Sequence, residues 1–144
     1  MPNYAIRPAT EEDSQELARL FTELGHPTTS AQILTHWPAW SHYGSQALVA
    51  AHVDGQLLGV ITLHSMIVLH RPKPVGRVSA LVVDARLRGS GVGRALMAAA
   101  ERVLKDGGCG LIEITSNNRL VDAHAFYEHL GYTRTSIRLA KNLD

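Results

Sequence analysis

The chain has 144 residues, of which 45% are hydrophobic and 19% charged, and its formal net charge is +1. This length and composition are typical of one compact globular domain, so we expect residues 1–144 to form a single domain. A charge so close to zero gives no reason to expect nucleic acid or an anionic membrane as a partner. The single cysteine excludes an internal disulfide. Because no signal peptide and no apolar run of membrane-spanning length is present, we expect a soluble cytoplasmic protein.

The N-terminal half of the sequence predicts a strand, two helices and a β-hairpin. In chain order these are a strand at residues 4–7, a helix that follows Thr10 and ends at Gly25, a second helix from about residue 30, and strands at residues 47–53 and 56–64. Three acidic residues follow Thr10, a pattern typical of a helix N-terminus. We expect Pro38 to interrupt the second helix, because proline lacks a backbone donor. Asp54 and Gly55 both tolerate positive φ, which favours a tight turn between the two strands.

The C-terminal half alternates strands and helices. In chain order the pattern predicts a strand at residues 78–83, a helix from about residue 91 to 105, a strand at 111–115, a helix at 122–130 and a final strand at 137–139. The apolar run at residues 80–83 is typical of a strand that is buried on both faces. Together the elements predict one α/β (α+β) domain with a mixed sheet.

A glycine-rich segment, Arg88-Gly89-Ser90-Gly91-Val92-Gly93-Arg94, lies between a predicted strand and a predicted helix. Glycine lets backbone amides approach a ligand closely, and a helix start adds unpaired N–H groups and partial positive charge. This combination suits a diphosphate. A Walker loop would need a Gly-Lys pair, and the dinucleotide fingerprint fails because its last glycine position holds Arg94 or Leu96. The pattern that remains is Arg88-x-x-Gly91-x-Gly93.

This pattern resembles the acetyl-CoA motif R/Q-x-x-G-x-G/A of the GNAT N-acetyltransferase superfamily. The order of the predicted elements is similar to the GNAT fold over nearly the whole chain, and the segment 123–132, with Phe126-Tyr127 and Gly131-Tyr132, is similar to the superfamily's second motif. The resemblance implies a mixed, mostly antiparallel central sheet with a splayed strand pair, flanked by about four helices. It also implies an N-acetyltransferase that uses acetyl-CoA.

The resemblance further implies where acetyl-CoA binds. The diphosphate would lie on the amides of residues 88–94, and the pantetheine arm would run between the strand ending at Val83 and the strand beginning at Leu111. The implied acetyl-CoA-binding residues are Leu81, Val82, Val83, Arg88, Gly89, Ser90, Gly91, Val92, Gly93, Arg94, Asn117, Ala123, Phe126 and Tyr127. A backbone N–H near Val83 would hold the thioester carbonyl, and Tyr127 would protonate the sulfur of CoA.

The base that removes the proton of the amine is left open between Glu113 and His64. Glu113 lies mid-strand, so its carboxylate is either directed into the acceptor cleft or fixed by a structural partner. His64 lies at the far end of the hairpin, near the expected entrance of the acceptor, and a neutral imidazole accepts a proton near pH 7. A water molecule could relay the proton to either group. We predict no metal site, because the histidines form no compact ligand set with a carboxylate.

We expect the acceptor to be the primary amine of a small molecule, attacked in a ternary complex. Segments around His64, Val83 and Asn117 resemble aminoalkylphosphonate N-acetyltransferases and small acetyltransferases of unassigned substrate. Those relatives carry acidic residues in the strand before the loop, whereas this chain has Arg77, which either attracts an anionic acceptor or is a surface arginine. The alternatives are a protein or peptide N-acetyltransferase and a non-catalytic acyl-CoA-binding module. A homodimer formed through the C-terminal strands is also open.

Overall fold

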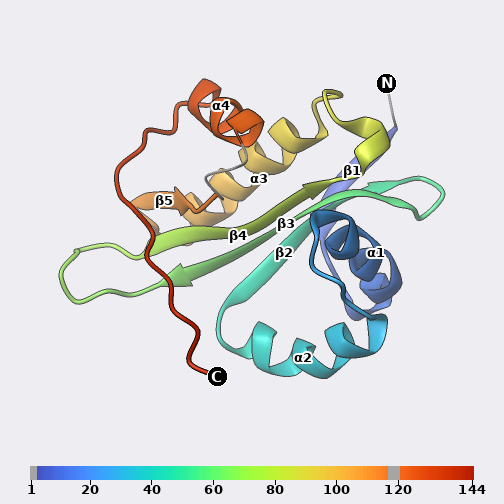
Figure 1. Ribbon diagram of the computed structural model, residues 1–144, viewed down its shortest axis with the longest axis horizontal. Helices are drawn as coiled ribbons and strands as arrows, with labels where there is room; N and C mark the ends of the chain where they lie inside the picture. The colour runs from blue at the N-terminus through green and yellow to red at the C-terminus, as the bar shows by residue number, and fades with distance from the viewer. Residues whose placement is uncertain (1–2, 117–120) are drawn as a thin grey trace. The chain divides into compact units, whose positions relative to one another are not determined.

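The computed structural model describes residues 3–116 and 121–144. The chain divides into two compact units, Met1–Glu113 and Ile114–Asp144. Its strands are β1 (Tyr4–Pro8), β2 (Ser45–His52), β3 (Leu57–Met66), β4 (Val75–Val83) and β5 (Leu111–Ile114), in the sheet order β1-β2-β3-β4-β5 (Figure 1). Its α-helices within the described residues are α1 (Ser14–Leu24), α2 (Ser30–His42), α3 (Val92–Asp106) and α4 (Val121–His129). The expected α/β fold with a mixed sheet is confirmed, and the expectation of a single domain stays a prediction.

Strands β1 to β4 form an antiparallel ladder whose register follows the hydrophobic pattern. Val49 pairs with Val60, and Val60 pairs with Val82, so three buried valines lie side by side on one face. The hairpin between β2 and β3 turns at Asp54, whose side chain accepts a hydrogen bond from the N–H of Gln56 at 2.9 Å. The predicted hairpin is therefore confirmed.

Helix α1 ends at Gly25 and helix α2 begins after Thr29, as the sequence predicts. A 3₁₀ turn, Glu11–Asp13, precedes α1, and the Asp13 carboxylate accepts the N–H of Thr10 at 2.8 Å. Gly25 ends α1 with a φ of 105°, in the left-handed region. Thr29 caps α2, because its hydroxyl accepts the N–H of Gln32 at 3.1 Å. Side-chain capping at the helix starts and the left-handed backbone of Gly25 set these boundaries, and both are local in sequence.

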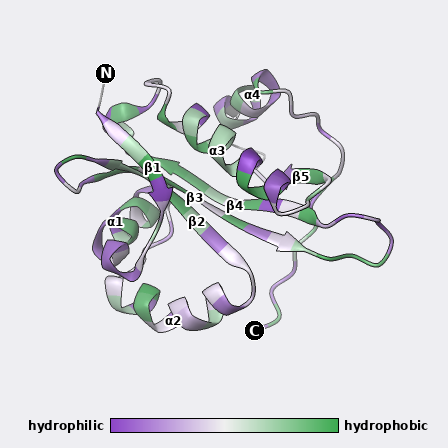
Figure 2. Cartoon of the chain, turned by 180° about the vertical axis from the view of Figure 1, so that it is seen from behind, coloured by the Kyte–Doolittle hydropathy of each residue, from purple (hydrophilic) through white to green (hydrophobic). Residues whose placement is uncertain are grey.

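The two faces of the sheet are covered by different helices of the first unit. Leu17 and Leu20 of α1 belong to a core cluster with Val49, Val60 and Val82, and α2 packs against the same cluster. Helix α3 covers the opposite face (Figure 1). Figure 2 shows the central strands in hydrophobic colours between these helices. The segment between β4 and α3, residues 84–91, therefore connects the sheet to the helix that covers this opposite face.

Pro38 does not interrupt α2, so that expectation is wrong. The helix continues to His42 with Pro38 inside it. Trp37 and Trp40 both pack against the core cluster, with ring centroids 4.9 Å apart. These two half-buried rings flank the proline, and the Ser41 hydroxyl donates to the Trp37 carbonyl at 2.9 Å. Apolar packing therefore outweighs the cost of one missing backbone bond.

Two further expectations are wrong. Strand β4 is not buried on both faces, because Ser79 is exposed and Leu81 and Val83 are half-buried. Burial on both faces belongs to the central strand β3, which has helices on both sides of the sheet. The second error is the final strand at residues 137–139. Residues 133–144 have no regular secondary structure, and Ile137 is 86% exposed, since three alternating residues without a paired neighbour do not make a strand.

In the described part of the chain, no helix has the length and apolar character needed to cross a membrane.

Candidate active site

The segment from Asp84 to Gly91 turns the chain from β4 into α3 through a series of tight turns. The Asp84 side chain accepts the N–H of Arg86 at 3.0 Å, and the N–H of Leu87 bonds the Asp84 carbonyl at 2.8 Å. The N–H of Ser90 then bonds the Leu87 carbonyl at 3.1 Å. Gly89 and Gly91 have φ values of 81° and 93°. These positive values explain why the loop needs glycine at both positions.

The end of this loop presents backbone donors and positive charge together. Gly91 is the N-cap of α3, and no side chain caps the helix there. The first amides of a helix have no partner within the helix and carry its partial positive charge. Arg88 and Arg94 are exposed on either side of them, whereas Val92 is fully buried and anchors the helix start. The predicted segment 88–94 therefore fits a diphosphate such as that of CoA.

Near the end of β4, the backbone N–H groups point alternately toward β3 and away from it. The N–H of Asp84 bonds the Leu58 carbonyl at 2.9 Å. Alternate residues of an antiparallel strand face the same neighbour, so the N–H of Val82, which is paired with Val60, also points toward β3. The N–H groups of Leu81 and Val83 consequently point toward the side of β4 where β5 lies in the sheet order. This orientation is the one that an extended pantetheine arm would need.

The two candidate bases lie on either side of one arginine. His64 on β3 is directly opposite Arg77 on β4. Arg77 donates from Nε to Glu113 Oε1 on β5 at 3.0 Å, and also from Nη2. Opposite residues of an antiparallel pair share a face, and His64 alternates with Thr62 and Val60, so this row lies on the face that α1 covers further along. The structure thus places Glu113 and His64 on either side of Arg77 in the sheet.

Glu113 has the structural partner that the sequence left open as one of two alternatives. Its side chain and that of Arg77 are each 38% exposed and form an ion pair. Next to this pair, Ser79 is the extra residue of a β-bulge, and its hydroxyl bonds that of Thr62 at 2.7 Å. The end of the row that carries Thr62, His64 and Arg77 is therefore polar, which suits a polar acceptor. Among the described residues, no group of three His, Cys, Asp or Glu side chains could hold a metal ion.

The remaining predicted site residues belong to the second unit. Ala123, Phe126 and Tyr127 lie on α4 and are half-buried. The Tyr127 ring lies 5.3 Å from that of Phe126 and 6.2 Å from that of Tyr132, centroid to centroid. Burial raises the pKa of the Tyr127 phenol above its usual value. Asn117 lies outside the described residues.

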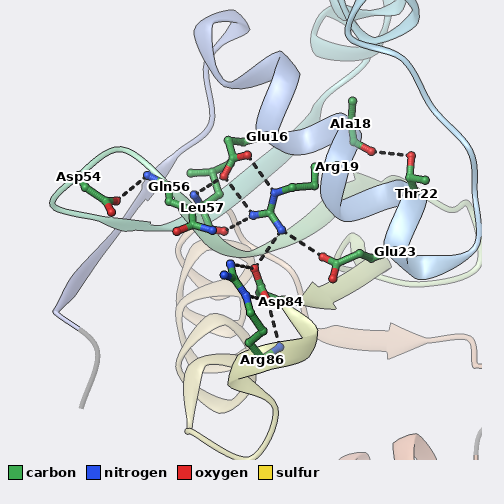
Figure 3. Close-up of polar contacts among 10 residues, drawn as sticks. All are labelled: Glu16, Ala18, Arg19, Thr22, Glu23, Asp54, Gln56, Leu57, Asp84 and Arg86. Carbon is green, nitrogen blue, oxygen red and sulfur yellow. Dashed lines mark hydrogen bonds and ion pairs between the residues drawn. The ribbon is translucent and has the colours of Figure 1, made fainter.

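Sequence reasoning missed the carboxylate that holds the loop to the rest of the first unit. Asp84 is only 1% exposed and forms ion pairs with Arg19 of α1 and Arg86 of the loop, both at 2.9 Å (Figure 3). The side-chain hydrogen bonds from Arg86 hold the pKa of Asp84 well below its usual range, against the opposing effect of burial. The available signal was an aspartate placed directly after a buried apolar run, because such a carboxylate needs a cation.

Comparison with known proteins agrees with this geometry. The sequence matches the acetyltransferase (GNAT) family over residues 11–132. It is 32% identical to an aminoalkylphosphonate N-acetyltransferase of Salmonella typhimurium, over 99% of this chain and 94% of that protein. It is 34% identical to an aminoglycoside N(6')-acetyltransferase type 1 of Stenotrophomonas maltophilia, over 60% of this chain and 59% of that protein.

The fold is also that of known acetyltransferases. The crystal structure of an acetyltransferase of Trypanosoma brucei superposes with a TM-score of 0.87 and 22% identity, over 98% of this chain and 100% of that one. At this identity the likeness shows the fold alone, and the family match and the curated relatives carry the activity. The chain belongs to the acetyltransferase (GNAT) family and is an acetyltransferase.

Proposed function

We propose that the protein transfers the acetyl group of acetyl-CoA to the primary amine of a small molecule by direct attack in a ternary complex. The amine nitrogen forms a bond with the acetyl carbon while the bond between that carbon and the CoA sulfur breaks. The amine loses a proton to a base, and the sulfur gains one from an acid. Acetyl-CoA thus supplies the activated acyl group, and the protein binds both partners and handles the two protons.

The observation that carries this proposal is the positively charged helix start that follows β4. The uncapped amides of α3, with exposed Arg88 and Arg94 beside them, can hold the diphosphate of CoA. The N–H groups of Leu81 and Val83 can pair with the pantetheine arm, and a backbone N–H near Val83 can donate to the thioester carbonyl. The segment that fits the diphosphate therefore follows, a few residues later in the chain, the strand edge that can bind the arm.

Tyr127 is the proposed acid, because a phenol is protonated at neutral pH and can donate that proton to the CoA sulfur. His64 is the better of the two candidate bases. The Glu113 carboxylate is already engaged by Arg77, whereas His64 lies beside this pair and is half-buried. A neutral imidazole can accept the proton of an ammonium group directly or through a water molecule.

We propose an acceptor that carries an anionic group as well as the amine. Arg77 lies in the polar row, and its guanidinium has N–H donors beyond the two that bond Glu113. Planar donor pairs of this kind recognise phosphonate and carboxylate groups. The relative that matches nearly the whole chain is named for aminoalkylphosphonates, which contain both groups.

The experiment is an acetyl-CoA-dependent thiol-release assay with a panel of amines. The panel contains 2-aminoethylphosphonate, amino acids, a polyamine, an aminoglycoside and a peptide with a free N-terminus, and a reaction without amine measures background hydrolysis. We expect the highest kcat/KM for an amine with an anionic group. Saturable binding of CoA without thiol release on any amine would contradict the proposal and favour a non-catalytic binding module. A preference for the peptide would favour a protein acetyltransferase instead.

A further inference from the structure

The buried aspartate at the start of the glycine loop, Asp84, accepts hydrogen bonds from two arginines and from a backbone N–H. Both oxygens of Asp84 are used. Oδ1 accepts from the backbone N–H and from Nε of Arg86, at 3.0 and 3.1 Å, and Oδ2 accepts from Arg86 Nη2 and Arg19 Nη1, each at 2.9 Å (Figure 3). A carboxylate that is 1% exposed and holds two arginines is costly to bury unless every bond is made. These hydrogen bonds therefore fix the position of the Asp84 side chain relative to Arg19 and Arg86.

One side of Asp84 is tied to the rigid part of the first unit. Arg19 of α1 also donates from Nη2 to the Leu57 carbonyl at 2.9 Å, and its Nε bonds Glu16 at 2.9 Å. Glu16 in turn accepts the N–H of Leu57 at 2.9 Å. These contacts join α1 to the first residue of β3, and Figure 3 shows that they converge on the Arg19 guanidinium. Arg19 is thus held in place by Glu16 and Leu57 as well as by Asp84.

The other side of Asp84 is tied to the loop. Its side chain caps the 3₁₀ turn at Ala85–Leu87, and its carbonyl accepts the N–H of Leu87 at 2.8 Å. The next turn bonds Ser90 to Leu87, and the Gly91 carbonyl accepts the first helical bond of α3, from Ala95 at 3.0 Å. The first two turns share Leu87, and the first helical bond begins at Gly91, the residue after Ser90. The direction of the amides of residues 88–94 therefore follows from where Asp84 is held.

We infer that Asp84 is a positioning residue for acetyl-CoA, because it connects α1 and β3 to the loop that carries the diphosphate-binding amides. The inference rests on the proposed function, since it assigns the diphosphate to residues 88–94. Two glycines give this loop a wide choice of conformations, and ordering them on binding costs affinity. With Asp84 in place the amides are already directed before the ligand arrives. Asp84 itself touches neither the acyl group nor the amine in this scheme.

The test is Asp84→Asn, which keeps the shape of the side chain and removes its charge. We expect KM for acetyl-CoA to rise about tenfold or more while kcat changes less than about threefold, because the diphosphate contacts act on binding. S-acetylpantetheine, a donor without the diphosphate, gives a second readout, and its kcat/KM should be unchanged. A merely structural role would lower the rates with both donors alike.

Two further variants keep the test decisive. Arg86→Gln removes the side-chain bonds to Asp84 from a residue that is 70% exposed, so it is expected to fold and to raise the same KM by about threefold or more. Asp13→Asn removes another arginine-bound carboxylate, the partner of Arg7, and should leave both donors unaffected. An unchanged KM in Arg86→Gln and Asp84→Asn, or an equal loss of kcat, overturns the role of Asp84. Failure of the wild-type protein to bind CoA would instead overturn the proposed function.

Discussion

Tyr127 is the residue whose chemistry is most specific to the proposed transfer. A phenol can protonate a leaving thiolate because it carries its proton at neutral pH. Its neighbour Phe126 has the same ring without a hydroxyl and lies 5.3 Å away. A change of Tyr127 to phenylalanine would keep the ring contact and remove only the hydroxyl.

We expect Tyr127→Phe to lower kcat by about ten- to a thousand-fold, with KM for acetyl-CoA little changed. The reason is that the variant removes the proton donor and keeps the ring. Steady-state kinetics measure the loss, and circular dichroism checks that the variant is folded. An unchanged kcat in a folded variant would remove Tyr127 from the mechanism.

The same logic separates the two candidate bases. We expect His64→Gln to lower kcat/KM by about a hundredfold near pH 7, because the base is lost. Glu113→Gln keeps a hydrogen-bond acceptor for Arg77 and should cost less than about tenfold if Glu113 only holds that arginine. The pH profiles of both variants are the measurement. The reverse order of effects would make Glu113 the base.

At the level of elements, α3 reaches the sheet only because β3 and β4 have glycine beneath it. A Cβ on Gly59 would lie 2.9 Å from the Val82 carbonyl oxygen and 3.0 Å from Leu96 Cδ1. A Cβ on Gly76 would lie 2.6 Å from Leu104 Cδ1. Both leucines are buried on α3. The position of α3, and with it the start of the helix that holds the loop, depends on this close approach.

We expect Gly59→Ala to destabilise the protein by about 1–3 kcal/mol, because the contact with a backbone carbonyl cannot be relieved by a side-chain movement. Thermal unfolding measures the effect. Gly107→Ala is the matched control: its Cβ would meet neighbours at 3.4 Å or more, and its φ is −79°. Equal stability of the two variants would show that α3 tolerates displacement from the sheet.

On the scale of the whole molecule, a near-zero net charge conceals carboxylates that are tightly held by arginines. Hydrogen bonds from Arg86 lower the pKa of Asp84, those from Arg7 lower the pKa of Asp13, and those from Arg19 lower the pKa of Glu16. In each case the folded chain binds a proton less readily than the unfolded chain. The stability that these groups contribute is therefore present above their usual pKa values and is lost as the pH falls below them.

We expect the melting temperature to be nearly constant from pH 7 to about pH 5 and to fall below about pH 4. Each kcal/mol lost would lower Tm by roughly 3–5 °C for a chain of this length. Differential scanning fluorimetry across pH measures the profile. In Asp13→Asn the fall should be shallower, since one of the titrating groups is gone. A profile identical to wild type would show that Asp13 does not contribute.

Much of the fold could be predicted because its signals are local. Thr10, Thr29 and Gly25 set helix ends through bonds within one turn, and Asp54-Gly55 sets the hairpin. The motif Arg88-x-x-Gly91-x-Gly93 likewise lies within one loop, so its positive φ values and its uncapped helix start follow from neighbouring residues. Capping and turn chemistry act over a few residues, and the sequence alone therefore determined most of the elements and the family, whereas the acetyl-CoA-binding residues stay a prediction.

Only the tertiary structure decided what depends on distant partners. The sequence left Glu113 open between a cleft and a structural partner, and that partner, Arg77, lies 36 residues away. Asp84 gave no sign of Arg19, which is 65 residues away on α1. Pro38 suggested a break in α2, but its sequence does not show that the neighbouring tryptophans pack against the core. Residues 137–139 suggested a strand, but their sequence does not show whether a neighbouring strand pairs with them. Burial and ion pairing are set by residues that the chain brings together only on folding, and a local pattern does not contain them.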